Sequence, residues 1–437
     1  MKKSFFIIAF LVGIAAYSRA QTLYFPPVLG NSWDTLSAGS LGWCTDKVDT
    51  LYDYLAANNS KAFILLKDGK IVFEKYFGNF TVDSVWYWAS AGKTLTAFLV
   101  GIAQQENLLS IEDTTSNYLG NGWTIAPIPK ERSITIKNQL TMTTGLDDGL
   151  PDNSCTIDTC LQYLANANTR WAYHNAPYTL LDSVIESASG TNLNNYFQQK
   201  IKPLTGINGL YVPSGFNNVF YSKPRSMARF GLLMLAKGNW NGVPVMTDTT
   251  YYHAMIQTSQ ALNLSYGYLW WLNGKSSFMV PGSQLVIPGP LCPSAPVDMY
   301  AGLGKNGQVV NIAPSQNIVW IRMGDAPGAG IVPIQMNDTI WQKLNAIMCA
   351  PNEVTNQSIQ TDNLKIYPNP AQGILNIVGT SGIYTFEIRN LLGELLWQEK
   401  EIRGIKKLDV SAFPNGVYVL NLLTTSGRKA YKVHIAN

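Results

Sequence analysis

Two pairs of apolar-rich stretches, one near each end of a long region, have the pattern of β-hairpins. Residues 61–67 and 70–76 are joined by an Asp-Gly dipeptide, which readily takes the positive φ angles that a two-residue hairpin turn requires. Residues 308–313 and 318–323 repeat this arrangement around a Pro-Ser-Gln-Asn turn. We therefore predict antiparallel sheet at both ends of this region.

Between the two hairpins, apolar residues recur at the spacing of amphipathic helices. The predicted helices cover residues 94–109, 178–189 and 226–237. The second is followed by Gly190 and the third by Gly238, and glycine often ends a helix. Strands at the two ends with helices between them predict an α+β fold, an antiparallel sheet flanked by helices with a helical subdomain.

The apolar pattern stops near residue 352, where Asn, Gln, Ser, Thr and Asp take over. This composition predicts a linker over residues 351–365. Beyond it, short alternating segments broken by Gly and Pro predict a small all-β sandwich over residues 366–437. Its expected strands are 374–378, 385–390, 394–397, 417–422 and 429–435.

The composition is that of a globular protein with a large core. Of the 437 residues, 46% are hydrophobic, and 12 Trp, 22 Tyr and 16 Phe supply bulky side chains to fill that core. The formal net charge is only +4, and no run of basic residues exceeds the pair Lys406-Lys407. Nucleic-acid binding is therefore disfavoured, because it requires a cluster of cations along the phosphate backbone.

Residues 1–20 have the organisation of a signal peptide. Two lysines precede an apolar run over residues 5–16, and small residues at positions 18 and 20 suit cleavage before Gln21. No other stretch approaches the roughly 20 apolar residues that a transmembrane helix needs. We expect a mature protein outside the cytoplasm, with its first domain over residues 21–350.

Five cysteines in an exported chain point to disulfide bonds, because compartments outside the cytoplasm oxidise thiols. Cys155 and Cys160 lie close together in a polar loop and are the best candidates for a local bridge. The pairing of Cys44, Cys292 and Cys349 stays open, and the odd count leaves one thiol unpaired. The cysteine spacings and the scattered histidines do not fit a zinc site, and no metal is expected.

The candidate chemistry begins at Ser90-Ala-Gly-Lys93. A serine hydroxyl is a weak nucleophile until a base takes its proton, and an amine one helical turn away can do so if burial keeps it neutral. Ser90 follows an aromatic run and opens the first predicted helix, which places Lys93 on the same face as Ser90. Tyr173-His174-Asn175 stands further along the chain. Together the two motifs predict a serine nucleophile with a lysine and a tyrosine to manage its proton.

Each short motif is weak by itself, since both recur in the C-terminal segment. Ser-x-x-Lys is found again at Ser426–Lys429, and Tyr-x-Asn at Tyr367–Asn369. A Ser-His-Asp triad is the rival mechanism, but His253 has no motif beside it and no Gly-x-Ser-x-Gly turn occurs. We interpret Asp147-Asp148, in a polar Gly-flanked loop, as a solvated turn rather than a metal site. We expect His174 to face outward or fill space rather than act as a base.

From about residue 35 to 348 the chain resembles the serine β-lactamase and penicillin-binding-protein superfamily, in particular its class C and serine-esterase branch. The resemblance rests on Ser90-Ala-Gly-Lys93, on Tyr173-His-Asn175 running into Ala-Pro-Tyr-Thr-Leu-Leu, on Leu-Thr-Met-Thr-Thr-Gly-Leu at 140–146 and on a similar helix at 228–235. It implies that Ser90 is the nucleophile and that Lys93 and Tyr173 share general-base and general-acid duty. It further implies that Asn175 orients the lysine and the substrate. Beside a lysine ammonium, Tyr173 should ionise more readily than at its reference pKa of about 10.

The third motif of this family, Lys-Thr/Ser-Gly on a strand facing the serine, is where the chain departs from the pattern. Counting back from the second hairpin places the motif position at residues 299–301. The backbone N–H groups of Ser90 and Gly302 would then bind the developing oxyanion. A second register would use Lys305-Asn-Gly307, which lies too close to Pro314 to leave room for the intervening turn.

No cation stands in the first register, where the chain has Tyr300. That cation helps to hold the carboxylate of penicillin-type substrates, so its absence favours an uncharged ester or amide. We expect Tyr300, Trp270 and Trp271 to line the substrate pocket. The resemblance implies hydrolysis of a small ester or amide through an acyl-enzyme, without a cofactor. A β-lactamase or D-alanyl carboxypeptidase acting on cell-wall peptides, and a catalytically silent binding homologue, remain the alternatives.

Residues 366–437 resemble the C-terminal sorting domain of the type IX secretion system. The resemblance rests on Tyr367-Pro-Asn-Pro370, on Gly393 in a turn, on Leu-Asp-Val-Ser-Ala-Phe-Pro-Asn-Gly-Val-Tyr-Val-Leu at 408–420 and on Lys432. It implies export through the periplasm to a secreted or cell-surface location, with the type IX machinery as the partner of this domain. No chemistry is expected there.

Overall fold

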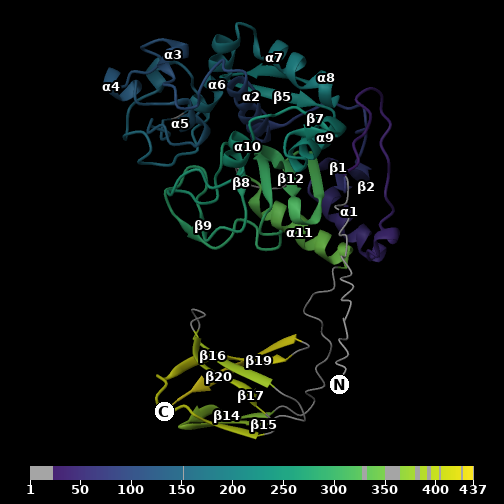
Figure 1. The fold of residues 1–437 in the computed structure, drawn as a ribbon, viewed down its shortest axis with the longest axis vertical. Coiled ribbons are helices and arrows are strands. Elements are labelled where there is room, and N and C mark those ends of the chain that lie inside the picture. The colour runs from purple at the N-terminus through teal and green to yellow at the C-terminus, as the bar shows by residue number, and fades with distance from the viewer. Residues whose placement is uncertain are drawn as a thin grey trace, which may run out of the picture. The chain divides into compact units, whose positions relative to one another are not determined.

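The computed structural model describes residues 23–150, 152–326, 332–349, 365–378, 384–390, 395–402, 405–424 and 427–436. The chain divides into two compact units, Met1–Ile347 and Met348–Asn437 (Figure 1). The predicted signal peptide, and the predicted linker up to residue 364, lie outside the described residues.

A six-stranded antiparallel sheet forms the centre of the first unit, in the order β2-β1-β13-β12-β11-β8. The predicted hairpins provide four of its strands, and β1 pairs with β13 so that the two hairpins lie side by side. The Asp68-Gly69 turn has φ angles of 53° and 83°, the left-handed backbone expected of this dipeptide. The strands are β1 (Ser60–Lys67), β2 (Lys70–Tyr76), β8 (Trp271–Leu272), β11 (Tyr300–Gly304), β12 (Gln308–Ala313) and β13 (Ile318–Gly324).

Helices cover both faces of this sheet. On one face α9 (Pro224–Leu235) approaches so closely that a Cβ at Gly231 would lie 2.4 Å from Cγ1 of Val319. The neighbouring sheet residue, Trp320, points to the opposite face and packs on Trp341 of α11 (Ile334–Met348), with ring centroids 6.4 Å apart. The predicted α+β class is therefore confirmed.

The other two predicted helices are α2 (Lys93–Gln105) and α6 (Asn175–Ser189), which pack against each other. Every residue of α2 from Lys93 to Ala103 is buried. Gly190 ends α6 with a φ of 68°, as predicted. These helices form the core of the helical subdomain, to which α3, α4 and α5 add at one end of the unit (Figure 1).

The remaining helices are short, and the remaining strands of this unit form small separate sheets. A three-stranded sheet, β3-β5-β4, lies beside the segment that leads into α2. The helices are α1 (Val48–Ala57), α3 (Ser116–Leu119), α4 (Ile128–Glu131), α5 (Ile136–Leu140), α7 (Leu193–Lys200), α8 (Lys202–Thr205) and α10 (Thr249–Met255), and the strands are β3 (Trp86–Tyr87), β4 (Gly209–Ser214), β5 (Asn217–Ser222), β6 (Asn239–Trp240), β7 (Val243–Pro244), β9 (Ser277–Phe278) and β10 (Ile287–Pro288).

The second unit is all β within its described residues. Its strands pair in the order β17-β16-β19-β20-β14-β15-β18, and β14 meets β20 at the single pair Ala371 and Ile435. Alternate residues of these strands form an apolar core that includes Leu375, Phe386 and Leu420. The strands are β14 (Lys365–Gln372), β15 (Ile374–Val378), β16 (Tyr384–Arg389), β17 (Leu395–Ile402), β18 (Ile405–Asp409), β19 (Gly416–Thr424) and β20 (Gly427–Ile435).

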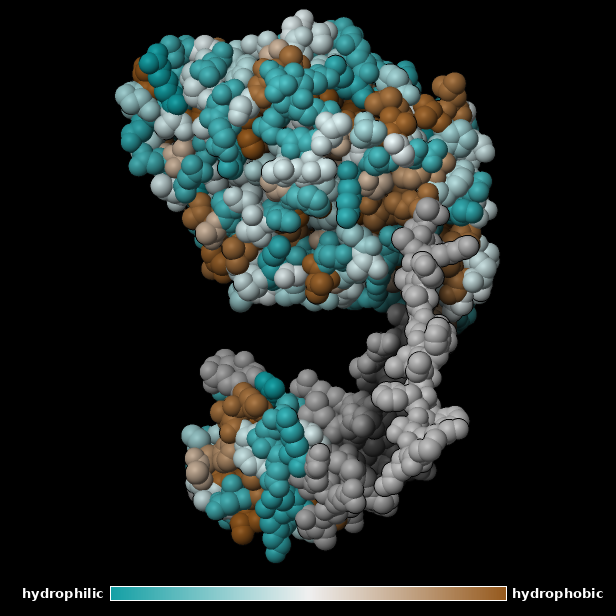
Figure 2. Space-filling model, in the orientation of Figure 1, coloured by the Kyte–Doolittle hydropathy of each residue, from teal (hydrophilic) through white to brown (hydrophobic). Residues whose placement is uncertain are grey.

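Hydrophilic residues cover much of the visible face of the first unit, with apolar groups scattered between them (Figure 2). Within the described ranges, no helix has the length and apolar character needed to cross a membrane.

Candidate active site

The two residues before Ser90 determine how the chain reaches it: Trp88 is buried, and Ala89 has a strained backbone conformation. The Trp88 ring packs on Phe220, with centroids 4.9 Å apart, and the Trp88 backbone N–H donates to the Phe220 carbonyl at 2.8 Å. Ala89 then has a φ of 45°, a left-handed conformation that costs a non-glycine residue free energy. This turn directs the chain into a 3₁₀ turn, Ala89–Gly92, which runs directly into α2.

Ser90 and Lys93 are in direct contact. Lys93 Nζ donates a hydrogen bond to Ser90 Oγ at 3.0 Å. The lysine side chain is buried, with a residue exposure of 3%, whereas Ser90 is partly exposed. The amine is therefore enclosed by the protein, whereas the serine residue is in part exposed to solvent.

Burial controls the proton affinity of Lys93. Desolvation lowers the pKa of the Lys93 ammonium from 10.5 to about 7, and the charge of Asp182 opposes this shift. Aromatic rings surround the amine, with Nζ 3.9 Å from the Tyr178 ring centroid and 5.2 Å from that of Tyr173. A large fraction of Lys93 is consequently neutral at neutral pH, and a neutral amine can accept a proton.

Tyr173 also reaches Ser90, from the segment just before α6. Its phenol interacts with Ser90, its ring centroid lies 5.2 Å from Lys93 Nζ, and the residue is only 4% exposed. The phenol ring stacks on Trp271, with centroids 5.8 Å apart and planes inclined by 23°. The fold therefore brings Ser90, Lys93 and Tyr173 together, although they come from distant segments.

The expected ionisation of Tyr173 is wrong. Burial raises the pKa of the Tyr173 phenol above its ordinary value of 10.0, and the interaction with Ser90 only partly offsets that rise. We expected the charge of Lys93 to lower this pKa. Since burial leaves a large fraction of Lys93 neutral, the positive charge beside Tyr173 is reduced and the residue remains a neutral phenol.

Asn175 is the first residue of α6, next to this group. Its backbone N–H donates to Asn153 Oδ1 at 2.9 Å, which ties the start of α6 to the loop after residue 146. Its side-chain oxygen is buried without a hydrogen-bond partner among the described residues. The structure thus places Asn175 beside the site, but no hydrogen bond joins it to Lys93 in the described part of the chain.

The strand β11 passes Ser90 in a different register from the one predicted. A Cβ at Gly304 would lie 3.1 Å from the Ser90 backbone nitrogen, so Gly304, and not Gly302, is the glycine against the serine. Gly302 lies against Thr94 and Val310 instead. The alternative register also fails, because Lys305–Gly307 forms the 3₁₀ turn that joins β11 to β12.

The backbone direction along β11 does not suit Gly302 as an oxyanion donor. Met299 O accepts a hydrogen bond from the β8 side, and successive residues of a strand direct their N–H groups to alternate edges. Gly302 therefore faces β12, with which it is paired. Leu303 faces the other edge, beyond the point at Ala301 where β8 ends its pairing, and Lys305 begins the 3₁₀ turn that follows β11. The N–H groups of these two residues are therefore the candidates at this open end of the strand.

The predicted pocket residues separate into two groups. Trp271 supports the site, because it carries the stacked ring of Tyr173. Trp270 and Tyr300 lie in the core instead, with their ring centroids 5.1 Å apart, and the Tyr300 hydroxyl donates to Met234 O of α9 at 3.0 Å. The expectation that Tyr300 and Trp270 line a substrate pocket is therefore wrong, because both rings are buried and pack on each other.

His174, between the two residues of the motif, is buried rather than facing outward. Burial lowers the pKa of its imidazole to about 4, against the opposing charges of Asp148 and Asp147. Asp148 is held by Arg170 at 2.6 Å. A neutral, enclosed imidazole fits the space-filling role that we expected of His174. Among the described residues, no group of His, Cys, Asp and Glu is arranged to hold a metal ion.

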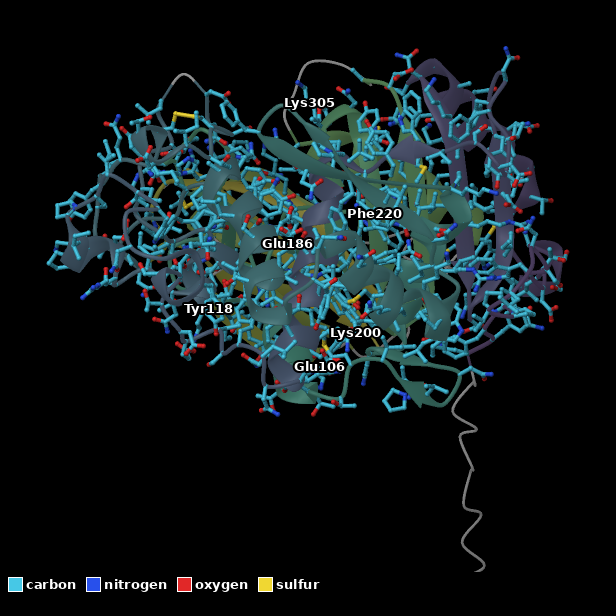
Figure 3. All side chains as sticks on the ribbon, turned by 90° about the horizontal axis from the view of Figure 1, so that it is seen from above. Glu106, Tyr118, Glu186, Lys200, Phe220 and Lys305 are labelled. Atoms are coloured by element: carbon cyan, nitrogen blue, oxygen red, sulfur yellow. A yellow bond between two sulfur atoms is a disulfide. The ribbon has the colours of Figure 1, made fainter. Side chains whose placement is uncertain are left out.

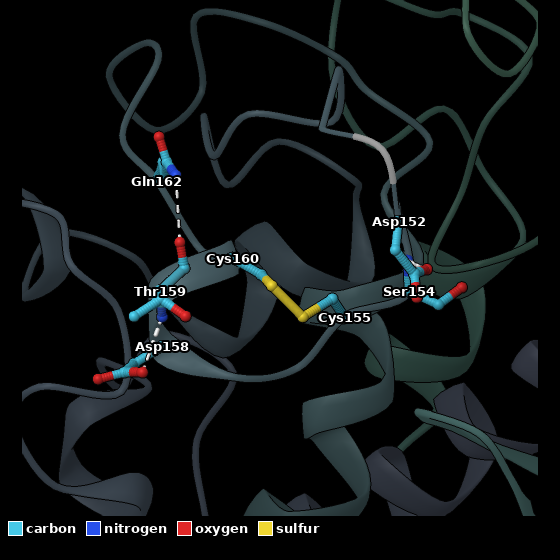
Figure 4. Close-up of a disulfide and its surroundings, with 7 residues drawn as sticks. All are labelled: Asp152, Ser154, Cys155, Asp158, Thr159, Cys160 and Gln162. Atoms are coloured by element: carbon cyan, nitrogen blue, oxygen red, sulfur yellow. Dashed lines mark hydrogen bonds between the residues drawn. A yellow bond between two sulfur atoms is a disulfide. The ribbon is translucent and has the colours of Figure 1, made fainter.

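A disulfide closes the loop that supports Asn175. Cys155 and Cys160 are bonded, with an S–S distance of 2.07 Å (Figure 4). Short polar contacts within the loop surround this bond, including Thr159 N to Asp158 Oδ1 at 2.7 Å. Cys44 and Cys349 are also disulfide-bonded, which the sequence left open, and Cys292 is a buried free thiol.

An antiparallel sheet flanked by helices, together with a serine that contacts a buried lysine, is typical of the β-lactamase-like serine hydrolase fold. The family model described as Beta-lactamase matches residues 55–328, which is more than half of the chain. The chain belongs to this family. A second family model, the secretion system C-terminal sorting domain, matches residues 365–436. A C-terminal domain of this kind is an export address, so the protein is secreted or displayed at the cell surface.

The similar structures share the fold at low identity. A protein of Bacillus anthracis, provisionally named a 6-aminohexanoate-dimer hydrolase, has a TM-score of 0.54 and 18% identity, over 77% of this chain and 89% of its own. A penicillin-binding-protein homologue of Caulobacter crescentus has a TM-score of 0.53 and 12% identity, over 70% of this chain and 98% of its own. An uncharacterised protein of Alkalihalophilus pseudofirmus is 23% identical over 302 residues, which are 61% of this chain and 83% of that protein.

Proposed function

We propose that this secreted protein hydrolyses a small ester or amide through an acyl-enzyme on Ser90, with Lys93 as general base and Tyr173 as proton donor. The observation that carries the proposal is the 3.0 Å contact between Lys93 Nζ and Ser90 Oγ, made by a lysine that is buried enough to lose its proton near neutral pH. Activation of a hydroxyl by a desolvated amine needs both features together.

In the acylation step, Lys93 takes the proton of Ser90 as Oγ attacks the substrate carbonyl carbon. The resulting oxyanion binds the backbone N–H groups of Ser90 and of the open β11 edge, for which Lys305 replaces Gly302 as our candidate. Tyr173, a neutral phenol beside Ser90, donates its proton to the leaving alcohol or amine and recovers one from the Lys93 ammonium. Water then attacks the acyl group by the reverse relay, releasing the acid and free Ser90.

The side of β11 that faces Ser90 supports an uncharged substrate. Gly302 and Gly304 lie against the serine segment, and Tyr300, two residues before Gly302, is buried in the core against α9. None of these three residues is a cation that could hold a substrate carboxylate. The name of the similar Bacillus anthracis structure refers to hydrolysis of an amide, which supports the amide part of this proposal but not the absence of a carboxylate on the substrate.

A penicillin-recognising enzyme is the second candidate, and Lys305 is the observation that favours it. This exposed cation directly follows Gly304 at the end of β11 and could reach a carboxylate there. Comparing hydrolysis of a p-nitrophenyl ester, a p-nitroanilide and a chromogenic cephalosporin by the purified protein separates the two candidates. We expect a higher kcat/KM for the ester or anilide, and faster cephalosporin hydrolysis would reverse the assignment.

A further inference from the structure

A buried polar cluster lies one helical turn beyond Lys93, between α2 and α6. We call it the Asp182 cluster, and its members are Asp182 of α6, Thr96 of α2, Asn218 of β5 and Tyr211 of β4. Thr96 and the Tyr211 hydroxyl are 3.4 Å apart, and the Thr96 side chain also lowers the pKa of Asp182. The cluster therefore connects the helix that carries Lys93 to the small sheet behind it.

Asp182 is an unusual residue for this position. It is only 6% exposed, in a helix face whose neighbours Leu181, Val184 and Ile185 are buried and apolar. Asn218 Nδ2 donates to its Oδ2 at 3.2 Å, whereas its Oδ1 has no hydrogen-bond partner among the described residues. A buried carboxylate with incomplete hydrogen bonding is costly unless a positive charge compensates it.

Lys93 is the charged group that can provide this compensation. Tyr178 lies one turn before Asp182 on α6, and its ring centroid is 3.9 Å from Lys93 Nζ, so this face of α6 is turned toward the amine. The interaction of Asp182 with Lys93 is coulombic, and it favours the ammonium form of the lysine. Asp182 thus acts on Lys93 through its charge across a water-poor interface, where charge interactions are strong.

We propose that Asp182 is a positioning residue for the Ser90-Lys93 pair, whose carboxylate stabilises the ammonium that forms when Lys93 takes the Ser90 proton. This inference rests on the proposed function for its catalytic meaning. It assigns the buried acid the part that a third group plays behind the base of a catalytic triad. No bond is made or broken at Asp182 itself.

The other titratable groups around the pair do not supply this charge. Tyr173 and Tyr178 face Lys93 from α6 and the segment before it, and burial raises the pKa of each phenol, so both remain neutral. Tyr211 faces Asp182 from β4 and is likewise kept neutral by burial. Glu186, one turn after Asp182, is an exposed carboxylate that raises the pKa of Asp182 (labelled in Figure 3).

Burial disfavours the charged forms of both Asp182 and Lys93. Burial raises the pKa of Asp182 and lowers that of Lys93, so burial favours the neutral form of each group, and the charge of each partner opposes that shift. A proton arriving on Lys93 shifts Asp182 toward the carboxylate, because each charge stabilises the other. The ionisation of Asp182 therefore changes when Lys93 takes the proton of Ser90.

The test compares Asp182→Asn with the wild-type full-length protein through the titration of the Lys93 ¹³Cε resonance, a readout that does not require turnover. Loss of the carboxylate should move the Lys93 midpoint to lower pH. In ester hydrolysis, the acidic limb of the kcat/KM profile should move the same way, while the plateau kcat falls about 10- to 100-fold. Asp53→Asn, which removes an exposed acid of α1, is the matched control and should change neither.

A folded Asp182→Asn variant with an unmoved Lys93 midpoint would overturn the inference. If that variant does not fold, Asn218→Ala removes the amide that holds the carboxylate and should shift the midpoint in the same direction by a smaller amount. An unmoved midpoint there would also contradict it. If the midpoint moves but the wild-type protein hydrolyses no ester or amide, the proposed function fails while the link between Asp182 and Lys93 stands.

Discussion

Tyr173 and Tyr367 begin the same Tyr-x-Asn pattern in the two units of the chain, and the units place the phenol in opposite environments. Tyr173 is 4% exposed, stacked on Trp271 and close to Ser90, whereas Tyr367 is 49% exposed on β14. Asn369 follows two residues later. Its side-chain amide donates to Lys432 O at 2.9 Å and accepts from the backbone N–H of His434, on the same strand as Lys432, so Asn369 supports strand pairing. The pattern acquires candidate chemistry only where burial and a neighbouring nucleophile come with it.

Among the variants, replacement of Ser90 is expected to have the largest effect on turnover. Ser90→Ala removes the nucleophile, and turnover of an ester substrate should fall at least about 1,000-fold, measured as kcat with the purified protein. The melting temperature should stay close to the wild-type value, because Ser90 is partly exposed. More than a tenth of the wild-type rate in this variant would place the nucleophile elsewhere.

Lys93→Met should reduce kcat at least about 100-fold, the scale for loss of a general base, and stabilise the fold. The folded-state pKa of Lys93, about 7, lies below the unfolded value of 10.5, so protonation favours unfolding between these values. The variant should therefore gain about 2–5 kcal/mol in unfolding free energy below pH 7 and nothing above about pH 10.5. Urea unfolding at pH 6 and pH 10.5 measures this.

Lys202→Met, at an exposed lysine of α8, is the matched control and should change neither property. A Lys93→Met protein that is less stable at pH 6 than the wild type would contradict the burial argument.

The dependence of kcat/KM on pH tests whether Lys93 acts as the base. Below its pKa of about 7, Lys93 carries a proton and cannot accept the one on Ser90. We expect kcat/KM to rise with pH and level off above about 7, with a tenfold loss for each pH unit below. A flat profile between pH 5.5 and 8 would argue against Lys93 as the base.

Gly304→Ala tests how closely β11 packs on the nucleophile segment. Its Cβ would lie 2.6 Å from Trp88 O and 3.1 Å from Ser90 N, so the strand or the serine must move. We expect about a tenfold loss of kcat and a destabilisation of about 1–3 kcal/mol. Gly39→Ala, whose Cβ would have only Ser37 Oγ nearby at 3.6 Å, is the control. Unchanged kinetics in Gly304→Ala would show that β11 does not set the position of Ser90.

The smallest effect is expected from removing the second unit. A chain ending at residue 364 should keep kcat within about twofold of the full-length value, because the candidate site lies wholly in the first unit. Export in a host with the secretion machinery should be lost. Loss of activity in a soluble, folded truncated protein would contradict the assignment of catalysis to the first unit and of export to the second.

Local chemistry explains which elements the sequence could predict. The Asp68-Gly69 turn and the helix end at Gly190 have backbone angles that few other residues adopt, so both were visible in the sequence. The register of β11 was not, because the compact turn at Lys305–Gly307, with Asn306 at a φ of 62°, is shorter than the Gly-rich stretch suggests. The sequence would have revealed it only if Asn306-Gly307 had been interpreted as a tight hairpin turn.

The pairing of Ser90 and Lys93 was predictable because one helical turn fixes their distance. The state of Tyr173 was not, since it depends on how completely the fold removes water from Lys93 and from the phenol. Asp182 was also missed, because a polar residue on a helix normally faces solvent and only the packing of α2 on α6 buries it. Charges in the interior are set by tertiary contacts that periodicity does not reveal.

The central claim is that Ser90 is a nucleophile activated by a neutral Lys93. Treating the folded protein with a fluorophosphonate probe at pH 8 and mapping the adduct by peptide mass spectrometry tests it most directly. We predict a single adduct on Ser90 that forms at least about 100-fold more slowly in Lys93→Met. An unlabelled Ser90 peptide in folded wild-type protein, or equal labelling rates in the two proteins, would contradict the claim.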